Sequence, residues 1–397
     1  MTEPTHTASE TTEALMERVR VAVPVLAAHA EATEERGRIA PESLEAMREA
    51  GLFALGTPVG FGGTDVDLVT QVRALSELGR ACPSSAWLVS ISTGTKAHFS
   101  GGFPEKVLAE VYSHPDVRWC GGSTPGQAVA VPGGVEVTGR WAYASGAEDA
   151  HWAFLAVVFV GDDGVPHVGG ALAPMSEMTV ERTWRVAGLQ GTGSHTVVAD
   201  GVFVPAERHF EFPLGSDGAP DLSQGRPLEI VSQTVSVTAT LAGAALGALD
   251  VVKAVVKTRK PPMTRYDSLA ESASARHVFA EAEHMVTSGY DRLISLAGRI
   301  DALLPGDDVT VVQRSSLRME VVSIVQQFVR AVDLLLDLHG SSAFALDNPL
   351  QRFWRDLNVG ARHAQLSTYI TTENYGLLVT GAAGAGGLSV RRPSLAA

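Results

Sequence analysis

The chain has 397 residues, 45% of them hydrophobic, which is enough for a sizeable core in two or three domains or in one composite fold. The formal net charge of -13 argues against non-specific binding to nucleic acid or to an anionic membrane surface. Two cysteines, Cys82 and Cys120, exclude a disulfide framework and a cysteine metal site, and they suit a reducing cytoplasm.

The sequence gives no sign of membrane insertion or export. No apolar run reaches the roughly 18 residues of a membrane-spanning helix. Residues 1–13 are polar and rich in threonine, without the basic flank and apolar core of a signal peptide. We therefore expect a cytoplasmic protein that has no membrane partner.

Residues 1–118 are predicted to form an N-terminal helical domain, because their apolar residues recur at helical spacing. Within it, Pro41 is a plausible helix start and Gly51 a plausible stop. Residues 119–223 change period: short β-rich runs such as WAFLAVVFV and HTVVADGVFVP are separated by Gly-rich turn signals. This second sector is predicted to be a central β-domain.

Residues 224–397 return to helical spacing in four long apolar-striped segments, which predicts a C-terminal four-helix bundle. The last segment, FWRDLNVGARHAQLSTYITTENYGLLV, is expected to be one helix. The apolar runs TLAGAALGAL (240–249) and VVSIVQQFVRAVDLLLDL (321–338) look too extensive for one bundle to hide. We therefore expect subunits to pack against each other, in a homotetramer.

Four segments, in this order, resemble the acyl-CoA dehydrogenase superfamily. They are REAGLFALGTPVGFGGTDVDL, GRWAYASGAEDAHWAFLAV, AGLQGTGSHTVVADGVFVPAER and HGSSAFALDNPLQRFWRDLNVGARHAQLS. The details SGAEDAHW and PLQRFWRD with a downstream histidine resemble its two-component flavin monooxygenases. The resemblance implies an α+β fold with a helical N-terminal domain, a central β-domain and a four-helix bundle, assembled as a homotetramer.

The same resemblance implies a chemistry. A separate NAD(P)H-dependent flavin reductase supplies FADH2 or FMNH2, and the reduced flavin reacts with O2 to a C4a-hydroperoxide. This species hydroxylates or N-oxygenates a small molecule, aromatic or an amino sugar. The sequence does not distinguish FMN from FAD, and it does not identify the substrate.

The candidate flavin-binding residues lie in the second and third sectors. The resemblance places Ser145 over the flavin ring, whereas spacing alone favours a turn serine before Gly146. Trp141 and Tyr143 alternate with alanines and are expected on one face, either near the flavin or in the core. The run containing Gly191, Thr192 and Ser194 either approaches the cofactor or forms an ordinary turn between strands. Arg259 is the phosphate ligand that the resemblance implies; the lysines around it fit a solvated helix end.

Two histidines join Ser145 as the catalytic candidates, and the resemblance brings both to the flavin pocket. His363 is expected on the last helix, where a glycine at position 360 leaves a gap toward the cofactor. His98 ends the first helical sector. Either could donate to the flavin hydroperoxide or accept a substrate proton, as a histidine can near neutral pH. The alternative for both is a structural histidine.

Two other functions stay open. An acyl-CoA dehydrogenase needs a carboxylate base, and Asp347 occupies the matching loop, one methylene shorter than the usual glutamate. We interpret Asp347 as a loop or helix-cap residue, and Arg355 and Asp356 as a structural ion pair or cap. A non-enzymatic binding protein on the same fold is the third possibility.

Overall fold

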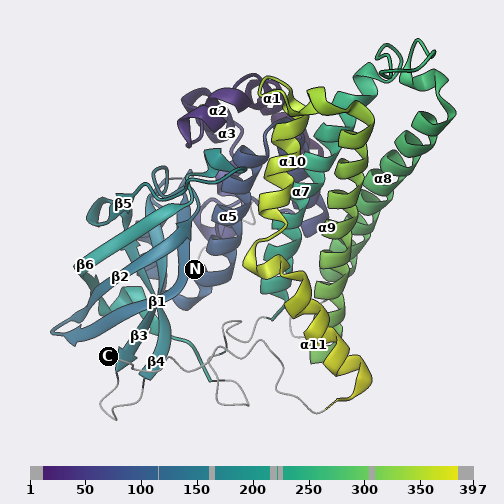
Figure 1. Cartoon of the computed structure of the whole chain (residues 1–397). Helices are drawn as coiled ribbons and strands as arrows, with labels where there is room; N and C mark the ends of the chain where they lie inside the picture. The colour runs from purple at the N-terminus through teal and green to yellow at the C-terminus, as the bar shows by residue number, and fades with distance from the viewer. Residues whose placement is uncertain are drawn as a thin grey trace.

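A computed structural model describes residues 12–114, 116–160, 166–214, 221, 227–303 and 309–382. Most of the polar segment at residues 1–13 lies outside these residues. Figure 1 shows the arrangement: helices from the two ends of the chain stand side by side, and the sheet lies against one flank of them.

The first sector folds into helices, as predicted. Helix α3 has Pro41 at its first position, and Gly51 follows its end at a φ of 67°, so both boundary signals are confirmed. Helix α4 begins after Asp67, whose carboxylate accepts the Thr70 N–H at 2.7 Å. The helices are α1 (Thr12–Ala28), α2 (Ala30–Arg36), α3 (Pro41–Glu49), α4 (Leu68–Ala81), α5 (Pro83–Phe99) and α6 (Glu105–Val111).

The described part of the second sector forms one seven-stranded sheet in the order β5-β6-β2-β1-β3-β4-β7. β1 and β3 run parallel, and the other pairs run antiparallel. The pairing of β1 with β3 shifts register between Gly122 and Gly126, which is a bulge in β1. The strands are β1 (Trp119–Val131), β2 (Gly134–Ala144), β3 (Trp152–Val160), β4 (Pro166–Pro174), β5 (Thr179–Glu181), β6 (His195–Pro205) and β7 (His209–Glu211).

The third sector contains three 29-residue helices followed by two shorter ones. The expectation of one helix for the last segment is wrong. α10 ends at Gly360, because His363 leaves the helical region with a ψ of 145° and its ring accepts the Gln365 N–H, which starts a new turn. The helices are α7 (Pro227–Val255), α8 (Ala273–Asp301), α9 (Val311–His339), α10 (Pro349–Gly360), the short η9 (Ala364–Leu366) and α11 (Thr368–Thr380).

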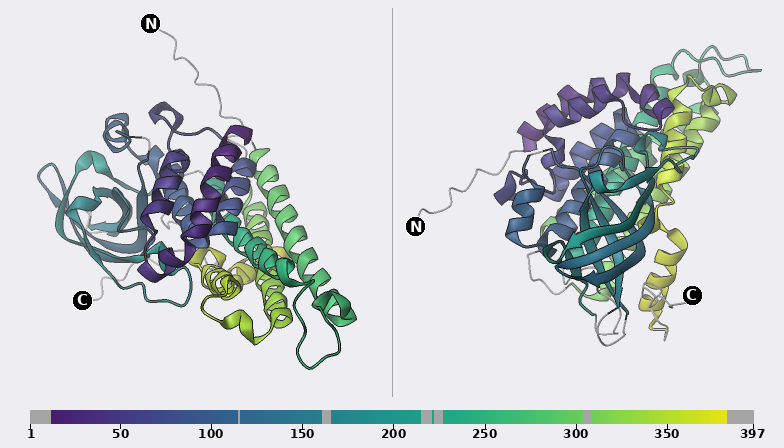
Figure 2. Two further views of the ribbon diagram at one scale, coloured as in Figure 1. Left: turned by 90° about the horizontal axis from the view of Figure 1, so that it is seen from above. Right: turned by 90° about the vertical axis from the view of Figure 1, so that its left-hand side faces the viewer.

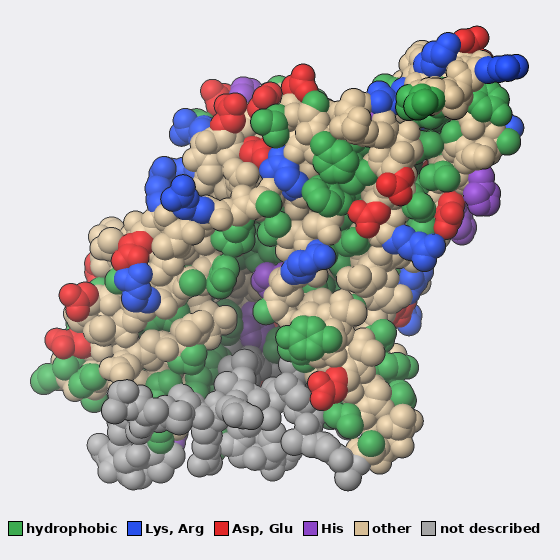
Figure 3. Space-filling view, viewed as in Figure 1, with side chains coloured by type: hydrophobic (Ala, Val, Ile, Leu, Met, Phe, Trp, Pro, Cys, Tyr) green, Lys and Arg blue, Asp and Glu red, His purple; other side chains and the backbone are tan. Residues whose placement is uncertain are grey.

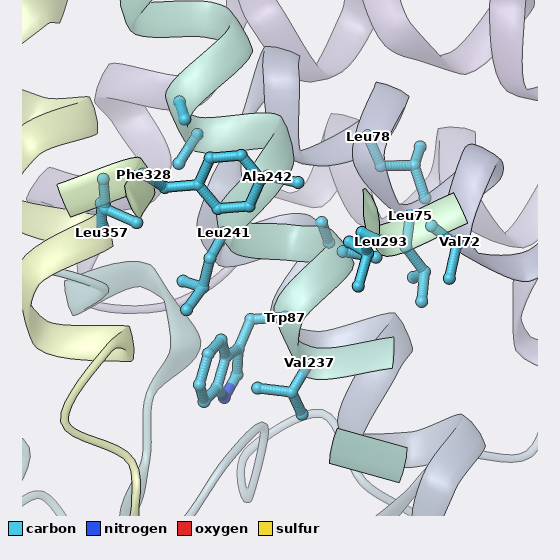
Figure 4. Close-up of a cluster of buried hydrophobic side chains, with 14 of the residues drawn as sticks. Val72, Leu75, Leu78, Trp87, Val237, Leu241, Ala242, Leu293, Phe328 and Leu357 are labelled. Carbon is cyan, nitrogen blue, oxygen red and sulfur yellow. The ribbon is translucent and has the colours of Figure 1, made fainter. Parts of the chain in front are cut away.

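The helices of the first and third sectors share one hydrophobic core. α7 lies at its centre and packs against α4 and α5 on one side and against α9 and α10 on the other. Figure 4 shows Leu75 of α4, Trp87 of α5, Leu241 of α7, Phe328 of α9 and Leu357 of α10 in the same cluster. The two helical sectors therefore depend on each other for burial of their apolar faces.

The apolar runs that motivated the homotetramer are buried within the single chain. All residues of 240–249 except Leu246 are buried, and the exposed positions of 321–338 are the polar Gln326, Arg330, Asp333 and Asp337. The argument from exposed apolar faces is therefore wrong, because helices of the N-terminal sector cover α7.

The expectation that no segment is apolar enough to span a membrane overlooked α7. Leu228–Val255 is long and apolar enough, but 83% of its most apolar window is buried inside the protein, as in a core helix. Serines and threonines interrupt the apolar run of this segment, so the sequence did not read as a continuous apolar stretch. Their hydroxyls bond to the helix backbone, as Thr234 does to the Ile230 carbonyl and Thr238 to the Thr234 carbonyl, each at 2.8 Å.

Candidate functional site

Helix α5 lies between the sheet and the helical bundle. It packs against β1 on one side and against α7 on the other. Figure 3 shows a hollow between the sheet and the helices, with histidine side chains at its floor. Eleven residues separate Trp87 from His98, close to three helical turns, so the two side chains share a face of α5 about 16 Å apart along its axis.

A network of buried hydroxyls joins the end of β2 to the start of β6 beside Trp87. Ser145 Oγ lies 2.8 Å from Ser194 Oγ and accepts the Trp87 Nε1–H at 3.2 Å. Ser194 Oγ lies 2.7 Å from Thr192 Oγ1, and Thr192 donates to the Leu189 carbonyl at 2.8 Å. The structure thus brings together three of the predicted residues, Ser145, Thr192 and Ser194. Ser145 is not a simple turn serine.

The two glycines of this segment have backbone roles. A Cβ on Gly191 would lie 2.3 Å from Thr33 Cγ2, so Gly191 lets the segment pack tightly on α2. Gly193 has a φ of 49° in the left-handed region that favours glycine. The space beside the Gly191 α-carbon is therefore taken by α2, and the flavin contact of this segment stays a prediction.

Trp141 and Tyr143 do not share a face, so that expectation is wrong. The reason is an irregularity at the end of β2: its register with β6 shifts between Trp141 and Ala144, and Tyr143 takes a φ of 64°. Trp141 is fully buried and donates its Nε1–H to the Ala156 carbonyl at 2.9 Å, which favours the core alternative. Tyr143 is 75% exposed, and its ring meets the Trp184 ring edge-on at 5.9 Å.

Trp141 lies across three glycines of β1 and β2. A Cβ added to Gly122 would lie 2.3 Å from the Trp141 Cβ, and one on Gly126 would lie 2.4 Å from its Cζ2. A Cβ on Gly139 would lie 2.8 Å from its Cη2. The indole therefore fills the space beneath the β1 bulge and supports its shape.

His363 lies in the break between α10 and η9, not on a helix. Its ring meets the Trp87 ring edge-on at 5.5 Å, which places it next to the hydroxyl network. Burial lowers the pKa of His363 to about 4, so the imidazole is neutral at pH 7. Nδ1 accepts the Gln365 N–H at 3.4 Å, which leaves the proton on Nε2. His363 is therefore a neutral hydrogen-bond donor and a weak base. The gap expected at Gly360 is filled by Leu241, Trp87 and Leu189.

His98 lies at the other end of the same face. It is buried, and its Nδ1 is 3.4 Å from Glu229 Oε2 of α7. Between the two ends, Gln233 lies on Gly94, where a Cβ would come within 2.5 Å of the Gln233 Cγ. Gln365 donates to Gln233 at 3.2 Å, while its own buried Oε1 has no partner among the described residues. Polar groups from several elements thus form a line along this face of α5, from His363 to His98.

Arg259 and Asp347 lie away from this face. Arg259 precedes α8 and donates to Ser342 in the loop before α10. Figures 1 and 2 show the α7–α8 loop at the end of the bundle far from the sheet. Asp347 is exposed, and the helix cap is Asn348, whose Oδ1 accepts the Leu350 N–H. Asp347 therefore caps no helix. It precedes the start of α10, whereas Asp356 lies in the second half of that helix.

Arg355 and Asp356 are structural, as interpreted, but they do not pair with each other. Arg355 forms an ion pair with Glu34 at 2.5 Å and donates to the Ala187 carbonyl. Asp356 is buried and accepts the Leu189 N–H at 2.5 Å. Both side chains hold the segment before β6 against α10.

The sequence reasoning missed four residues of the site: Trp87, Trp184, Gln233 and Gln365. A glycine in the middle of α5, Gly94, was the available signal for Gln233, because it marks a close approach. Trp87 and Trp184 carry no local signal, since both are aromatic residues that pack in part against the core.

The site fits a flat heteroaromatic ring. The exposed Tyr143 ring, held by Trp184, offers a ring face, and Ser145 and His363 offer polar atoms beside Trp87. Planar stacking with a few convergent polar groups is typical of cofactor pockets. The residues present therefore suit a flavin.

The comparisons with known proteins agree. Residues 9–100 match the acyl-CoA dehydrogenase N-terminal domain model, and residues 235–368 match the acyl-CoA dehydrogenase C-terminal domain model. The chain is 33% identical to the FADH(2)-dependent resorcinol hydroxylase oxygenase component of Rhizobium sp. (strain MTP-10005), over 89% of this chain and 90% of that one. It is 30% identical to the flavin-dependent monooxygenase oxygenase subunit HsaA of Rhodococcus jostii, over 88% and 94%.

A solved structure shows the same fold. XiaF from Streptomyces sp., in complex with FADH2 and glycerol, superimposes with a TM-score of 0.85 at 29% identity, over 94% of this chain and 96% of that one. Fold, site and sequence identity lead to the same assignment. The chain belongs to the acyl-CoA dehydrogenase family, in its branch of flavin-dependent monooxygenase oxygenase components.

Proposed function

We propose that this protein is the oxygenase of a two-component flavin-dependent monooxygenase that hydroxylates a small aromatic molecule. A separate NAD(P)H-dependent reductase supplies FADH2 or FMNH2. The names of the relatives support this, since they include a monooxygenase oxygenase subunit, the oxygenase component of a resorcinol hydroxylase and an indole-3-acetate monooxygenase. The observation that carries the proposal is a line of polar groups along α5. Ser145 and His363 lie against its Trp87 end, and His98 lies at the other end.

When bound, reduced flavin supplies the activation of O2 and the transfer of one oxygen atom. The chain would hold its ring between Tyr143, Trp184 and the hydroxyl of Ser145. His363, neutral with its proton on Nε2, donates a hydrogen bond next to the ring without releasing a proton to it. His98, oriented by Glu229, faces the substrate and accepts its hydroxyl proton.

The dehydrogenase alternative lacks its base at this site. Asp347 is exposed in the loop before α10, and a base must come within hydrogen-bond reach of the proton that it removes. Of the carboxylates at the site, Asp356 is already bonded to the Leu189 N–H, and Glu229 lies 3.4 Å from His98 Nδ1. We therefore favour oxygen transfer over α-proton abstraction.

Two further parts of the proposal concern assembly and location. Arg259 can contact a flavin phosphate at this hollow only if a second copy of the chain contributes it, which supports the homotetramer that the family resemblance implies. The cysteines Cys82 and Cys120 are free and buried, which supports a cytoplasmic location.

The test is a reductase-coupled assay with NADH, FAD or FMN, and O2, screened against phenols, resorcinol, indoles and amino sugars. We expect one hydroxylated product per NADH consumed with an aromatic substrate. Anaerobic turnover of an acyl-CoA with an artificial electron acceptor would instead support the dehydrogenase. Failure to bind either reduced flavin, in a titration of the folded protein, would leave only a non-enzymatic binding protein.

A further inference from the structure

The hydroxyl network beside Trp87 has a fixed order of protons. Each hydroxyl has one proton to donate. Thr192 gives its proton to the Leu189 carbonyl, so Ser194 must donate to Thr192, and Ser145 must then donate to Ser194. Ser145 Oγ also accepts the Trp87 Nε1–H. What Ser145 has left for a ligand is therefore a lone pair.

The backbone of Leu189 fixes this order of hydroxyl protons. Its carbonyl accepts the Thr192 hydroxyl at 2.8 Å and the Trp184 Nε1–H at 2.9 Å, so it fixes both the hydroxyl chain and the ring that holds Tyr143. Leu189 itself has a φ of 53°, a left-handed conformation that is costly for a residue with a branched side chain. Such a conformation persists only where the surroundings impose it.

Asp356 imposes it from α10. Its Oδ1 accepts the Leu189 N–H at 2.5 Å, 167 residues away in sequence. Gly188 lies so close to α10 that a Cβ there would be 2.3 Å from the Arg355 carbonyl carbon. The charged groups around Asp356 are Glu34 of α2 and Arg352 and Arg355 of α10, with the Cys82 thiol also near.

We propose that Asp356 is a positioning residue that makes the site selective for reduced flavin. By accepting the Leu189 N–H, it holds the backbone conformation of Leu189, and so keeps Ser145 an acceptor at the ring. Reduced flavin carries an N–H at N5, where oxidised flavin has a lone pair, so an acceptor favours the reduced form and repels the oxidised one. This inference rests on the proposed function.

The experiment measures dissociation constants of the flavin-free protein for reduced flavin, under anaerobic conditions, and for oxidised flavin, with both FAD and FMN. The quantity of interest is the ratio of the oxidised to the reduced constant. In D356A the Leu189 peptide is released, the proton order is no longer fixed, and we expect the ratio to fall by about tenfold, the value of one hydrogen bond. D356N keeps an acceptor oxygen and should retain the ratio.

A second variant breaks the chain elsewhere. T192V removes the hydroxyl that fixes the direction, so Ser194 and Ser145 can reverse, and the ratio should again fall by about tenfold. Two matched controls should keep the wild-type ratio. T196V removes the hydroxyl of Thr196 on β6, which lies 2.8 Å from the Thr183 hydroxyl. D301A removes a carboxylate that accepts the N–H groups of Leu68 and Val69 on another helix.

Hydrogen exchange supplies a readout without flavin. In D356A, amides 187–192 should exchange faster while those of β1 and β3 are unchanged. A D356A protein whose two constants weaken equally, or whose exchange is unchanged, would overturn the proposal. If D356A does not fold, an unchanged ratio in T192V overturns it. Wild-type protein that binds neither form of flavin would overturn the proposed function instead.

Discussion

The two ends of the α5 face that carries Trp87 and His98 are built differently. At the Trp87 end, the hydroxyls of Ser145, Ser194 and Thr192 bond to one another, and His363 is neutral. At the His98 end, a histidine meets the carboxylate of Glu229 across two helices. Between the two ends, the amide of Gln365 donates to Gln233 and keeps an oxygen without a described partner. The hydrogen bonds of the first end are formed without a ligand, as suits a flavin ring that is common to the family. The second can form new hydrogen bonds, as suits a substrate that differs between relatives.

The largest effect should come from the fixed end. In H363A the neutral donor beside the flavin is lost, and we expect the rate of product formation to fall by about 100-fold, the scale of one preorganised donor. Reduced flavin should still bind, so O2 is diverted to H2O2. The measurement is the ratio of H2O2 to product per NADH consumed, with H277A, an exposed histidine of α8, as the control. Unchanged coupling in H363A would return His363 to a structural role.

The adaptable end should show a smaller and more specific effect. In E229Q the charged partner of His98 is replaced by a neutral amide, and we expect kcat/KM for a phenolic substrate to fall by about tenfold. The affinity for reduced flavin should not change, because Glu229 meets His98, about three turns along α5 from the Trp87 that bonds to Ser145. H98A should lower kcat/KM at least as far as E229Q does. Weaker flavin binding in E229Q would contradict the division of α5 into two ends.

The pH dependence of stability separates two buried groups of the fixed end. Burial raises the pKa of Asp356 to about 7, above its value in the unfolded chain, so this group destabilises the fold as pH rises from about 4 to 7. Burial lowers the pKa of His363 to about 4. The stability that depends on the neutral imidazole is therefore present above about pH 6.5 and is lost as pH falls toward 4. D356N should therefore raise Tm at pH 8 by about 2 °C or more. Equal Tm values for D356N and wild type at pH 8 would argue against a charged Asp356.

The smallest effect is expected outside the site. Asp347 is exposed in the loop before α10, and D347A should change the rate of hydroxylation by less than about twofold, as surface substitutions do. A loss of turnover in D347A, measured in the same reductase-coupled assay, would reopen the dehydrogenase alternative.

Sequence patterns predicted the fold better than the details of the site. Helical and strand periods are local, so the order of helices, sheet and helices could be read directly, as could the boundaries at Pro41 and Gly51. The separation of Trp141 from Tyr143 could not, because it depends on a register shift between β2 and β6. The break before His363 depends on a ring nitrogen that caps a backbone N–H.

The sequence pattern also did not predict which helices bury α7. A stripe of apolar residues shows that a helix needs a partner, but not which partner it has. Here the helices that cover α7 come from the other end of the chain, about 150 residues earlier. The hydroxyl network likewise joins three segments that are far apart in sequence. Ser145 and Ser194 could be named as candidates through the family resemblance, while their mutual contact required the fold.

The indole that lies across three glycines has a consequence for how this protein can evolve. Gly122, Gly126, Gly139 and Trp141 form one interlocked unit, because a methyl group at any of the three glycines would overlap the ring. None of the four positions can therefore drift independently. A smaller residue at 141 opens a void that only a simultaneous enlargement of a glycine could fill, so the unit should change by paired substitutions or not at all.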